Sequence, residues 1–315
     1  MKLITLFTIG FMTLFVKESI GWEHNQYFYA NKELNSTDSS QINKQRLGWV
    51  VGSKACGLTG SIIILDRMWY SDFPRGSFHF EDDIQHWKQL DKWGHVTSAY
   101  HISSASYRMF KWTGLENNQS ALYGSLVSTL FMTSIEVLDG FSKEWGFSVS
   151  DQAANMLGAG MFYSQQIIWE TQKIKPKYSF TSSGLEKYHP ELLGSNRIEN
   201  MLKDYNGMTF WLSMNMNMFS PHREIFPDWL NVAVGYGGDG MLGSVENPDK
   251  YDGQTLPELK RYRQWYLAPD IDLSRINTDS RFLQLMFDAM DFIKMPAPAV
   301  EYNRKHGWQF HLVYF

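Results

Sequence analysis

The sequence predicts an α+β fold, with a four-helix domain at about residues 46–175 followed by a small antiparallel strand-rich region at about 176–315. Upstream of residue 176, apolar residues recur at helical spacing over long segments that glycine or proline brings to an end. Downstream, the apolar period becomes two residues, as in a strand with one wetter face. Separate runs of helices and strands are typical of α+β proteins.

The first 21 residues have the pattern of a secretory signal peptide. Lys2 precedes an apolar run at residues 3–16, and the small residues Ser19 and Gly21 stand immediately before Trp22. A run of this length is short for a bilayer span, and an uncleaved anchor helix is the alternative. We therefore expect residues 1–21 to direct export.

Two segments of opposite character follow. Residues 22–45 are polar and lack an apolar period, which predicts a linker. Residues 47–70 are apolar and rich in small residues, with Gly48 and Gly52 four apart, so that another backbone can approach closely. The segment fits either a membrane span or a tightly packed helix of a soluble bundle. Lys54 lies inside the segment and favours the packed helix.

Three more helices are predicted from apolar periodicity and end signals. One pattern runs from about residue 84 to 112 and contains Gly94, where we expect a break. The next runs from about 118 to 138 and ends before a glycine. The last runs from about 150 to 173, and Pro176 ends it because proline cannot continue a helix.

The region after residue 176 holds four predicted strands and one amphipathic helix. The strands are expected at about 210–218, 229–236, 263–273 and 308–315, and the helix at 280–293. Aromatic alternation that ends in Phe315 is also typical of the closing strand of an outer-membrane barrel. Known barrels have about eight strands or more, so four strands favour a small antiparallel sheet packed on the helices.

Composition limits the classes of function. The formal net charge of −4 gives no indication of nucleic-acid binding. Cys56 is the only cysteine, so the chain forms no internal disulfide and depends on a core of its own. Aromatic residues make up 16% of the chain, and such side chains favour boundaries between water and apolar surroundings. The partners left open are an envelope protein and a membrane surface.

Acids, one histidine and one asparagine recur inside segments that otherwise have the pattern of apolar helices. They form pairs three or four residues apart, which share a helix face: Asp91 with His95, Glu136 with Asp139, and Asp151 with Asn155. Buried ionised groups are costly unless they are paired, hydrogen-bonded or bound to metal. We therefore expect these side chains to meet in one water-poor pocket between helices.

This set of side chains suits two kinds of chemistry. Carboxylates and imidazole are ligands for a divalent ion such as Mg²⁺, Mn²⁺ or Zn²⁺, and the candidate metal ligands are Asp91, His95, Glu136, Asp139 and Asp151. In a catalytic role, His95 would act as general base together with Glu136 and Asp151. Lys92 and Asn155 complete the polar cluster.

A purely structural interpretation is also open, in which the cluster locks the helices together. Asp91 would cap a helix that begins at Lys92. Asp151 would form a capping box with Ser148, because the Ser-x-x-acid spacing fits. Asn155 would hydrogen-bond a neighbouring helix, and Lys92 would neutralise an acid of the 136–139 pair.

The polar residues belong to a longer signature: Asp91-Lys92-x-x-His95, Glu136-x-x-Asp139-Gly140 and Trp145-Gly146-x-Ser148-x-x-Asp151-x-x-Ala154-Asn155-x-x-Gly158. This signature resembles the YfiM-like envelope proteins, the family named domain of unknown function 2279, and the flanks resemble its longer members from Bacteroidetes-type bacteria. The resemblance implies a Gram-negative cell-envelope protein, often a periplasmic lipoprotein, without an assigned activity. The chain departs from the lipoprotein pattern because no acceptor cysteine follows the leader.

A shorter resemblance, over residues 91–158, is to VanZ-like membrane proteins, and it implies a helical fold near lipid or glycan precursors. We therefore expect an exported protein in the periplasm or outer membrane of a Gram-negative bacterium, with a structural or scaffold role. The alternative is a metal- or histidine-assisted hydrolase that acts on a lipid or glycan component of the envelope. The cofactor that the ligand set would take is one divalent metal ion.

Overall fold

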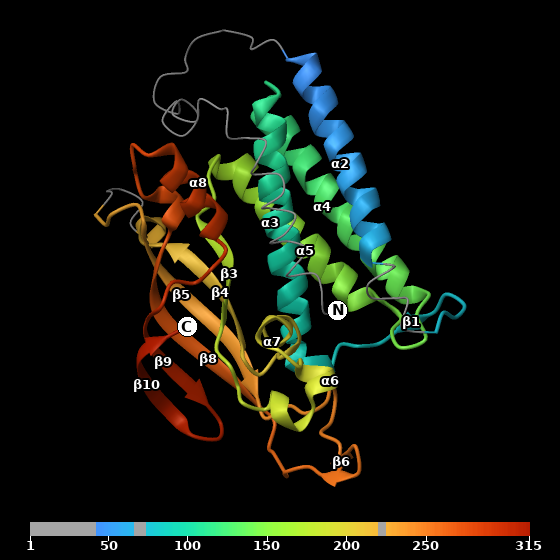
Figure 1. Cartoon of the computed structure of the whole chain (residues 1–315). Helices are drawn as coiled ribbons and strands as arrows, with labels where there is room; N and C mark the ends of the chain where they lie inside the picture. The colour runs from blue at the N-terminus through green and yellow to red at the C-terminus, as the bar shows by residue number, and fades with distance from the viewer. Residues whose placement is uncertain (1–41, 66–73, 220–224) are drawn as a thin grey trace.

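The computed structural model describes three stretches of the chain, residues 42–65, 74–219 and 225–315. The predicted signal peptide at 1–21 and nearly all of the predicted linker at 22–45 lie outside the described residues. The end of that linker, Lys44 and Gln45, already belongs to the first described helix. Long helices lie beside a curled antiparallel sheet (Figure 1), which confirms the predicted α+β class.

Four long helices make up the helical layer. They are α2 (Lys44–Leu65), α3 (Leu90–Trp112), α4 (Asn117–Gly140) and α5 (Val149–Trp169). Helices α3, α4 and α5 pack against one another, and α2 packs along α3 and α4 (Figure 1). The break expected at Gly94 is wrong, because α3 continues through it. The irregular backbone lies earlier, in η4 (His86–Gln89), where three consecutive residues have positive φ.

Glycines set the spacing between α3 and its two main neighbours. A Cβ atom on Gly124 of α4 would lie 2.8 Å from the carbonyl oxygen of Ser103. A Cβ atom on Gly158 of α5 would lie 2.2 Å from the carbonyl oxygen of Val96. Both crossings therefore require glycine, whereas no atom lies within 4 Å of a Cβ built on Gly160.

Gly158→Ala is expected to lower the free energy of unfolding by about 1–3 kcal/mol, because the added methyl overlaps the backbone of α3 in a packed core. Gly160→Ala is the matched control on the same helix. It is expected to be neutral or to stabilise by up to about 1 kcal/mol, since alanine favours helix over glycine. Urea unfolding followed by circular dichroism measures both. Equal losses in the two variants would contradict the close approach of α5 to α3.

The second layer is a six-stranded antiparallel sheet whose strands follow one another in chain order from edge to edge. The strands are β3 (Ile174–Phe180), β4 (Met208–Asn215), β5 (Leu230–Asp239), β8 (Tyr262–Ile271), β9 (Ala297–Asn303) and β10 (Gly307–Tyr314). The four predicted strands correspond to β4, β5, β8 and β10. The first of them was predicted too long, because the chain after β4 forms the 3-10 turn η6 (Met216–Phe219).

Strands β3 and β9 were not predicted, because each contains a proline. Pro176 lies inside β3 and does not simply end a helix, as had been expected. Because β3 is an edge strand, the missing N–H of proline is tolerated there. Pro298 lies inside β9. Proline is an unreliable stop signal where the following chain is already extended.

The sheet curls until its two edge regions touch. The Tyr314 hydroxyl lies 3.0 Å from Thr209 Oγ1, and the Thr181 hydroxyl donates to the carbonyl oxygen of Phe315. Buried lysine–aspartate pairs occupy the inner face: Lys175 with Asp272 at 2.8 Å and Asp291 at 2.6 Å, and Lys177 with Asp270 at 2.9 Å. The same face also carries a buried apolar cluster, so the inner face combines paired charges with apolar side chains: Trp211, Ala233, Tyr266, Ala268 and Ala299.

The other face of the sheet packs on the start of α3. Tyr178, Phe210 and Tyr236 form a core with Leu90, the first residue of that helix. The remaining elements are short: β1 (Phe80–Glu81), β2 (Phe147–Ser148), η5 (Glu186–Tyr188), α6 (Pro190–Leu193), α7 (Arg197–Lys203), β6 (Lys250–Tyr251), β7 (Gln254–Thr255), η7 (Leu273–Arg275) and α8 (Arg281–Met290). Because α3 lies between the sheet and the other helices, its first turns are held on both sides.

Candidate functional site

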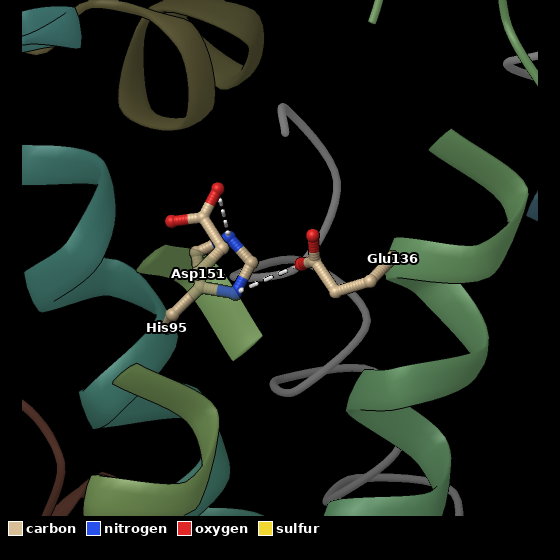
Figure 2. A group of neighbouring side chains, drawn as sticks. All are labelled: His95, Glu136 and Asp151. Carbon is tan, nitrogen blue, oxygen red and sulfur yellow. Dashed lines mark ion pairs between the residues drawn. The ribbon is translucent and has the colours of Figure 1, made fainter. Parts of the chain in front are cut away.

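Three helices bring polar side chains together at one end of the helical layer (Figure 2). His95 lies in the second turn of α3, Glu136 near the end of α4 and Asp151 in the first turn of α5. Ser148 is the N-cap of α5, and its hydroxyl accepts a hydrogen bond from the Asp151 N–H at 2.9 Å. This cap fixes where α5 begins and therefore where the Asp151 side chain is presented.

The imidazole of His95 lies between the two carboxyl groups (Figure 2). Its Nδ1 is 3.5 Å from Glu136 Oε1, and its Nε2 is 3.6 Å from Asp151 Oδ2. Asn155 Oδ1 lies 2.9 Å from Nδ1. With that oxygen as acceptor, Nδ1 carries the proton and Nε2 presents its lone pair. One ligand atom from each of His95, Glu136 and Asp151 lies within 4.8 Å of the others, and all three residues are buried.

A second group of carboxylates adjoins the first and shares Asp151. The ammonium of Lys92 lies 2.7 Å from Asp83 Oδ2, 2.8 Å from Asp91 Oδ2 and 2.9 Å from Asp151 Oδ1. Asp83, Asp91 and Asp151 also offer ligand atoms within 4.8 Å of one another. One lysine therefore occupies the centre of three carboxylates, and Asp151 connects this group to His95 and Glu136.

Burial makes three of these carboxyls hard to ionise. Loss of hydration, with the negative charges of Asp151 and Asp139 nearby, raises the pKa of Glu136 to about 9. Burial and the charge of Asp151 likewise raise the pKa of Asp91 to about 7, although Lys92 opposes the shift. Burial also raises the pKa of Asp151 itself. The site without a bound cation therefore retains protons on acids that are ionised in water.

Asp83 and Lys92 form the charged part of the cluster. Burial disfavours an ionised Asp83, but hydrogen bonds with Asp151, Lys92, Ser148 and Ser150 hold the pKa of its carboxyl well below the usual value. Burial likewise disfavours a charged Lys92, but its acidic neighbours raise the pKa of the ammonium group. The Asp83 and Lys92 side chains, at 12% and 13%, are more exposed than the 1% of His95. The cluster therefore runs from near the surface to the interior.

Several buried polar atoms at the inner end of the cluster have no hydrogen-bond partner among the described residues. They are His95 Nε2, Glu136 Oε1 and Asn155 Nδ2. Buried polar atoms in folded proteins are nearly always hydrogen-bonded, and each exception calls for a ligand, a water or a functional reason. A histidine nitrogen and a carboxylate oxygen are metal-ligating atoms, which makes this group a candidate metal centre.

The structure separates the five predicted metal ligands. His95, Glu136 and Asp151 converge, and Asp91 belongs instead to the group around Lys92. Asp139 joins neither group of converging ligand atoms, although its charge acts on Glu136.

The structural interpretations have mixed outcomes. Asp91 is not the cap of α3, because Gln89 holds that position and the helix begins at Leu90. Lys92 pairs with Asp83, Asp91 and Asp151, so its expected pairing with Glu136 or Asp139 is wrong. The hydrogen bond from Asn155 to the neighbouring helix α3 is confirmed, through His95. The capping box is confirmed in its first half, because Ser148 caps α5 and accepts from the Asp151 N–H, while the Asp151 carboxyl pairs with Lys92.

Asp83 is the site residue that the sequence did not identify as one. Its carboxyl Oδ1 accepts hydrogen bonds from Ser148 at 2.5 Å and Ser150 at 2.7 Å, in addition to its ion pair with Lys92. The signal available in the sequence was the Ser-x-Ser pair at the start of α5, which offers two donors to an acid.

Comparison with known proteins identifies the segment that carries this site. No curated protein and no solved structure is significantly similar to the chain. Residues 78–166 match the model of a protein family, DUF2279, which is described as predicted periplasmic lipoprotein. Over these residues, the match confirms the resemblance to this family seen in the sequence. The stretch from just before β1 to the last turn of α5, which includes every residue of the cluster, is therefore similar to the DUF2279 family of predicted periplasmic lipoproteins.

Proposed function

We propose that this is a cell-envelope protein that binds one divalent cation at His95, Glu136 and Asp151, and that the cation ties α3, α4 and α5 together. The observation that carries the proposal is the convergence of buried ligand atoms, two of which lack a hydrogen-bond partner within the described residues. The family description supports a location in the periplasm. We propose a structural role for the protein, at the periplasmic or outer-membrane face, because the site joins three helices.

Charge explains why a cation would be held at this position. Ionised Glu136 and Asp151 are unfavourable in a buried place, and a divalent ion would supply the compensating charge. A histidine nitrogen among the ligands favours Mn²⁺ or Zn²⁺ over Mg²⁺, which prefers oxygen ligands and bound water. The neighbouring carboxylate group already holds the Lys92 ammonium, so we expect one ion per chain rather than two.

Metal content of the purified protein tests this proposal directly. After loading with Mn²⁺ or Zn²⁺ and desalting, elemental analysis is expected to find about one equivalent in the native chain. His95→Ala and Glu136→Gln are expected to reduce this at least tenfold, because each removes a ligand. Asp139→Asn is the matched control on α4, since Asp139 is outside the converging group, and it is expected to retain the metal. Absence of metal from the native chain would overturn the proposal.

A second candidate function rests on the orientation of His95. Asn155 holds Nδ1 at 2.9 Å, and the unpartnered Nε2 faces Asp151. This is the arrangement of an oriented general base, which supports a metal- or histidine-assisted hydrolase acting on an envelope lipid or glycan. Hydrolysis of defined phospholipids and glycan fragments by the native protein, lost in His95→Ala at unchanged fold, would favour this candidate. An inert, metal-loaded protein would favour the structural role.

A further inference from the structure

The outer surfaces of α4 and α5 carry no charged residue over most of their length. Residues 117–135 and 152–169 contain no Asp, Glu, Lys, Arg or His. Asn118, Gln119 and Ser164 are the polar residues exposed on these stretches. The large side chains that the stretches expose are apolar, among them Leu126 at 47%, Leu130 at 64% and Leu157 at 63% exposure. Soluble proteins normally expose apolar residues singly and scattered over the surface. An uncharged face that extends over two neighbouring helices is larger than this and indicates a contact surface.

We propose that this face contacts the hydrocarbon layer of a phospholipid bilayer. The two uncharged stretches hold 19 and 18 residues. At about 1.5 Å per helical residue they extend about 27–29 Å, close to the roughly 30 Å of a bilayer's hydrocarbon core. Helix α4 also meets the length and hydropathy of a membrane-crossing helix, and only 39% of its most apolar window is buried within the protein.

Both ends of the uncharged face carry the side chains found at membrane interfaces. At one end, Lys173 Nζ lies 5.2 Å from the centre of the Trp169 ring, just after α5. At the other end, the exposed rings of Phe78, Phe80 and Phe141 contact one another, with centres 5.4 Å and 5.3 Å apart. Aromatic rings and lysine are enriched where hydrocarbon meets headgroups.

The position of charge favours a bilayer over a protein partner. Specific protein interfaces carry a polar rim with charged and hydrogen-bonding groups that select the partner. Here the ionisable residues lie beyond the ends of both helical stretches: Glu116 before one and the buried Glu136 after it, the buried Asp151 before the other and Glu170 after it. The polar cluster thus stands at the level of the headgroups. The proposal does not depend on metal binding.

The native chain offers a direct probe, because Cys56 is its only cysteine. In a Cys56→Ser background, Leu126→Cys places a nitrobenzoxadiazole label on the uncharged face. Ile198→Cys on α7, with a native side chain 63% exposed, is the matched control. With vesicles of phosphatidylethanolamine and phosphatidylglycerol, the label at 126 is expected to shift to the blue, brighten several-fold and be quenched by acyl-chain nitroxides. The label at 198 is expected to stay unchanged.

Two results would overturn the proposal. One is an unchanged label at 126 in a protein that circular dichroism shows to be folded. The other is a shift that depends on protein concentration without lipid, which would mean that a second copy covers this face. Leu126→Asp combined with Leu157→Asp is expected to abolish flotation with vesicles, and persistent flotation would also contradict the proposal. Glu136→Gln is expected to float normally, so failure of the cation site and failure of bilayer contact are separate outcomes.

Discussion

Lys92→Met is expected to destabilise the protein by about 3–5 kcal/mol at neutral pH, the usual cost of removing one partner from a buried ion pair. The Lys92 ammonium lies within 2.9 Å of carboxylate oxygens from Asp83, Asp91 and Asp151. Without it, three acids face one another in a site with little access to solvent. Urea unfolding measures the loss, which is expected to shrink as the pH falls and the acids take up protons.

Lys203→Met is the control for Lys92→Met. Lys203 pairs with Glu199 one turn away on α7, at 3.1 Å and at partly exposed positions. Such pairs contribute about 0.3–0.5 kcal/mol. A similar loss in both variants would show that the three acids near Lys92 are already neutral or solvated.

Divalent cations provide a second readout of Lys92→Met. Asp83, Asp91 and Asp151 offer ligand atoms within 4.8 Å of one another once the ammonium is gone. The variant is therefore expected to bind two equivalents of Mn²⁺ where the native chain binds one, and to recover part of its lost stability. One equivalent in both proteins would show that the second group cannot replace its lysine with a metal ion.

The helices and the polar pairs on their faces were predictable because helical spacing is local information. The convergence of three helices was inferred from the cost of burying unpaired ionised groups. Residues three or four apart share a face, so Asp151 and Asn155 had to project together from α5. The pairing partner of Lys92 was not predictable in the same way. A lysine side chain is long and flexible, and from the start of α3 it could reach an acid on α4 or on α5. The close packing of α5 against α3 at Gly158 brings Asp151 within reach of Lys92.

Asp83 shows where local information ends. It belongs to the loop before α3, and its place beside Ser148 depends on the positive φ of Trp87, Lys88 and Gln89. Three consecutive non-glycine residues rarely adopt this conformation, and no residue type signals it. Long-range packing imposes it, because Trp87 is buried in the core against the sheet and stacks on Tyr205 with ring centres 5.0 Å apart.

Glu136→Gln is expected to change the free energy of unfolding in opposite directions with and without bound metal. In the presence of a chelator, the native chain keeps the Glu136 carboxyl protonated. The pKa of this carboxyl is about 9 in the folded chain and about 4.5 in the unfolded chain. A raised carboxyl pKa contributes stability that is complete below the unfolded value and is lost as the pH rises toward the folded one. The native chain should therefore lose stability between about pH 5 and 9, by up to about 1.4 kcal/mol per pH unit from this group. Glutamine does not titrate, so the variant escapes this loss.

With saturating Mn²⁺ or Zn²⁺ the order of stability is expected to reverse. An ionised Glu136 then contributes a ligand, and binding of the ion to the folded state alone raises the native chain's free energy of unfolding. The variant lacks that ligand and gains little. Thermal unfolding of both proteins at pH 6, 7.5 and 9, in chelator and in metal, measures the crossing. Asp91, Asp151 and Lys92 are present in both chains, so their titration largely cancels in the comparison. Parallel melting curves in all six conditions would mean that Glu136 neither holds a buried proton nor binds a cation.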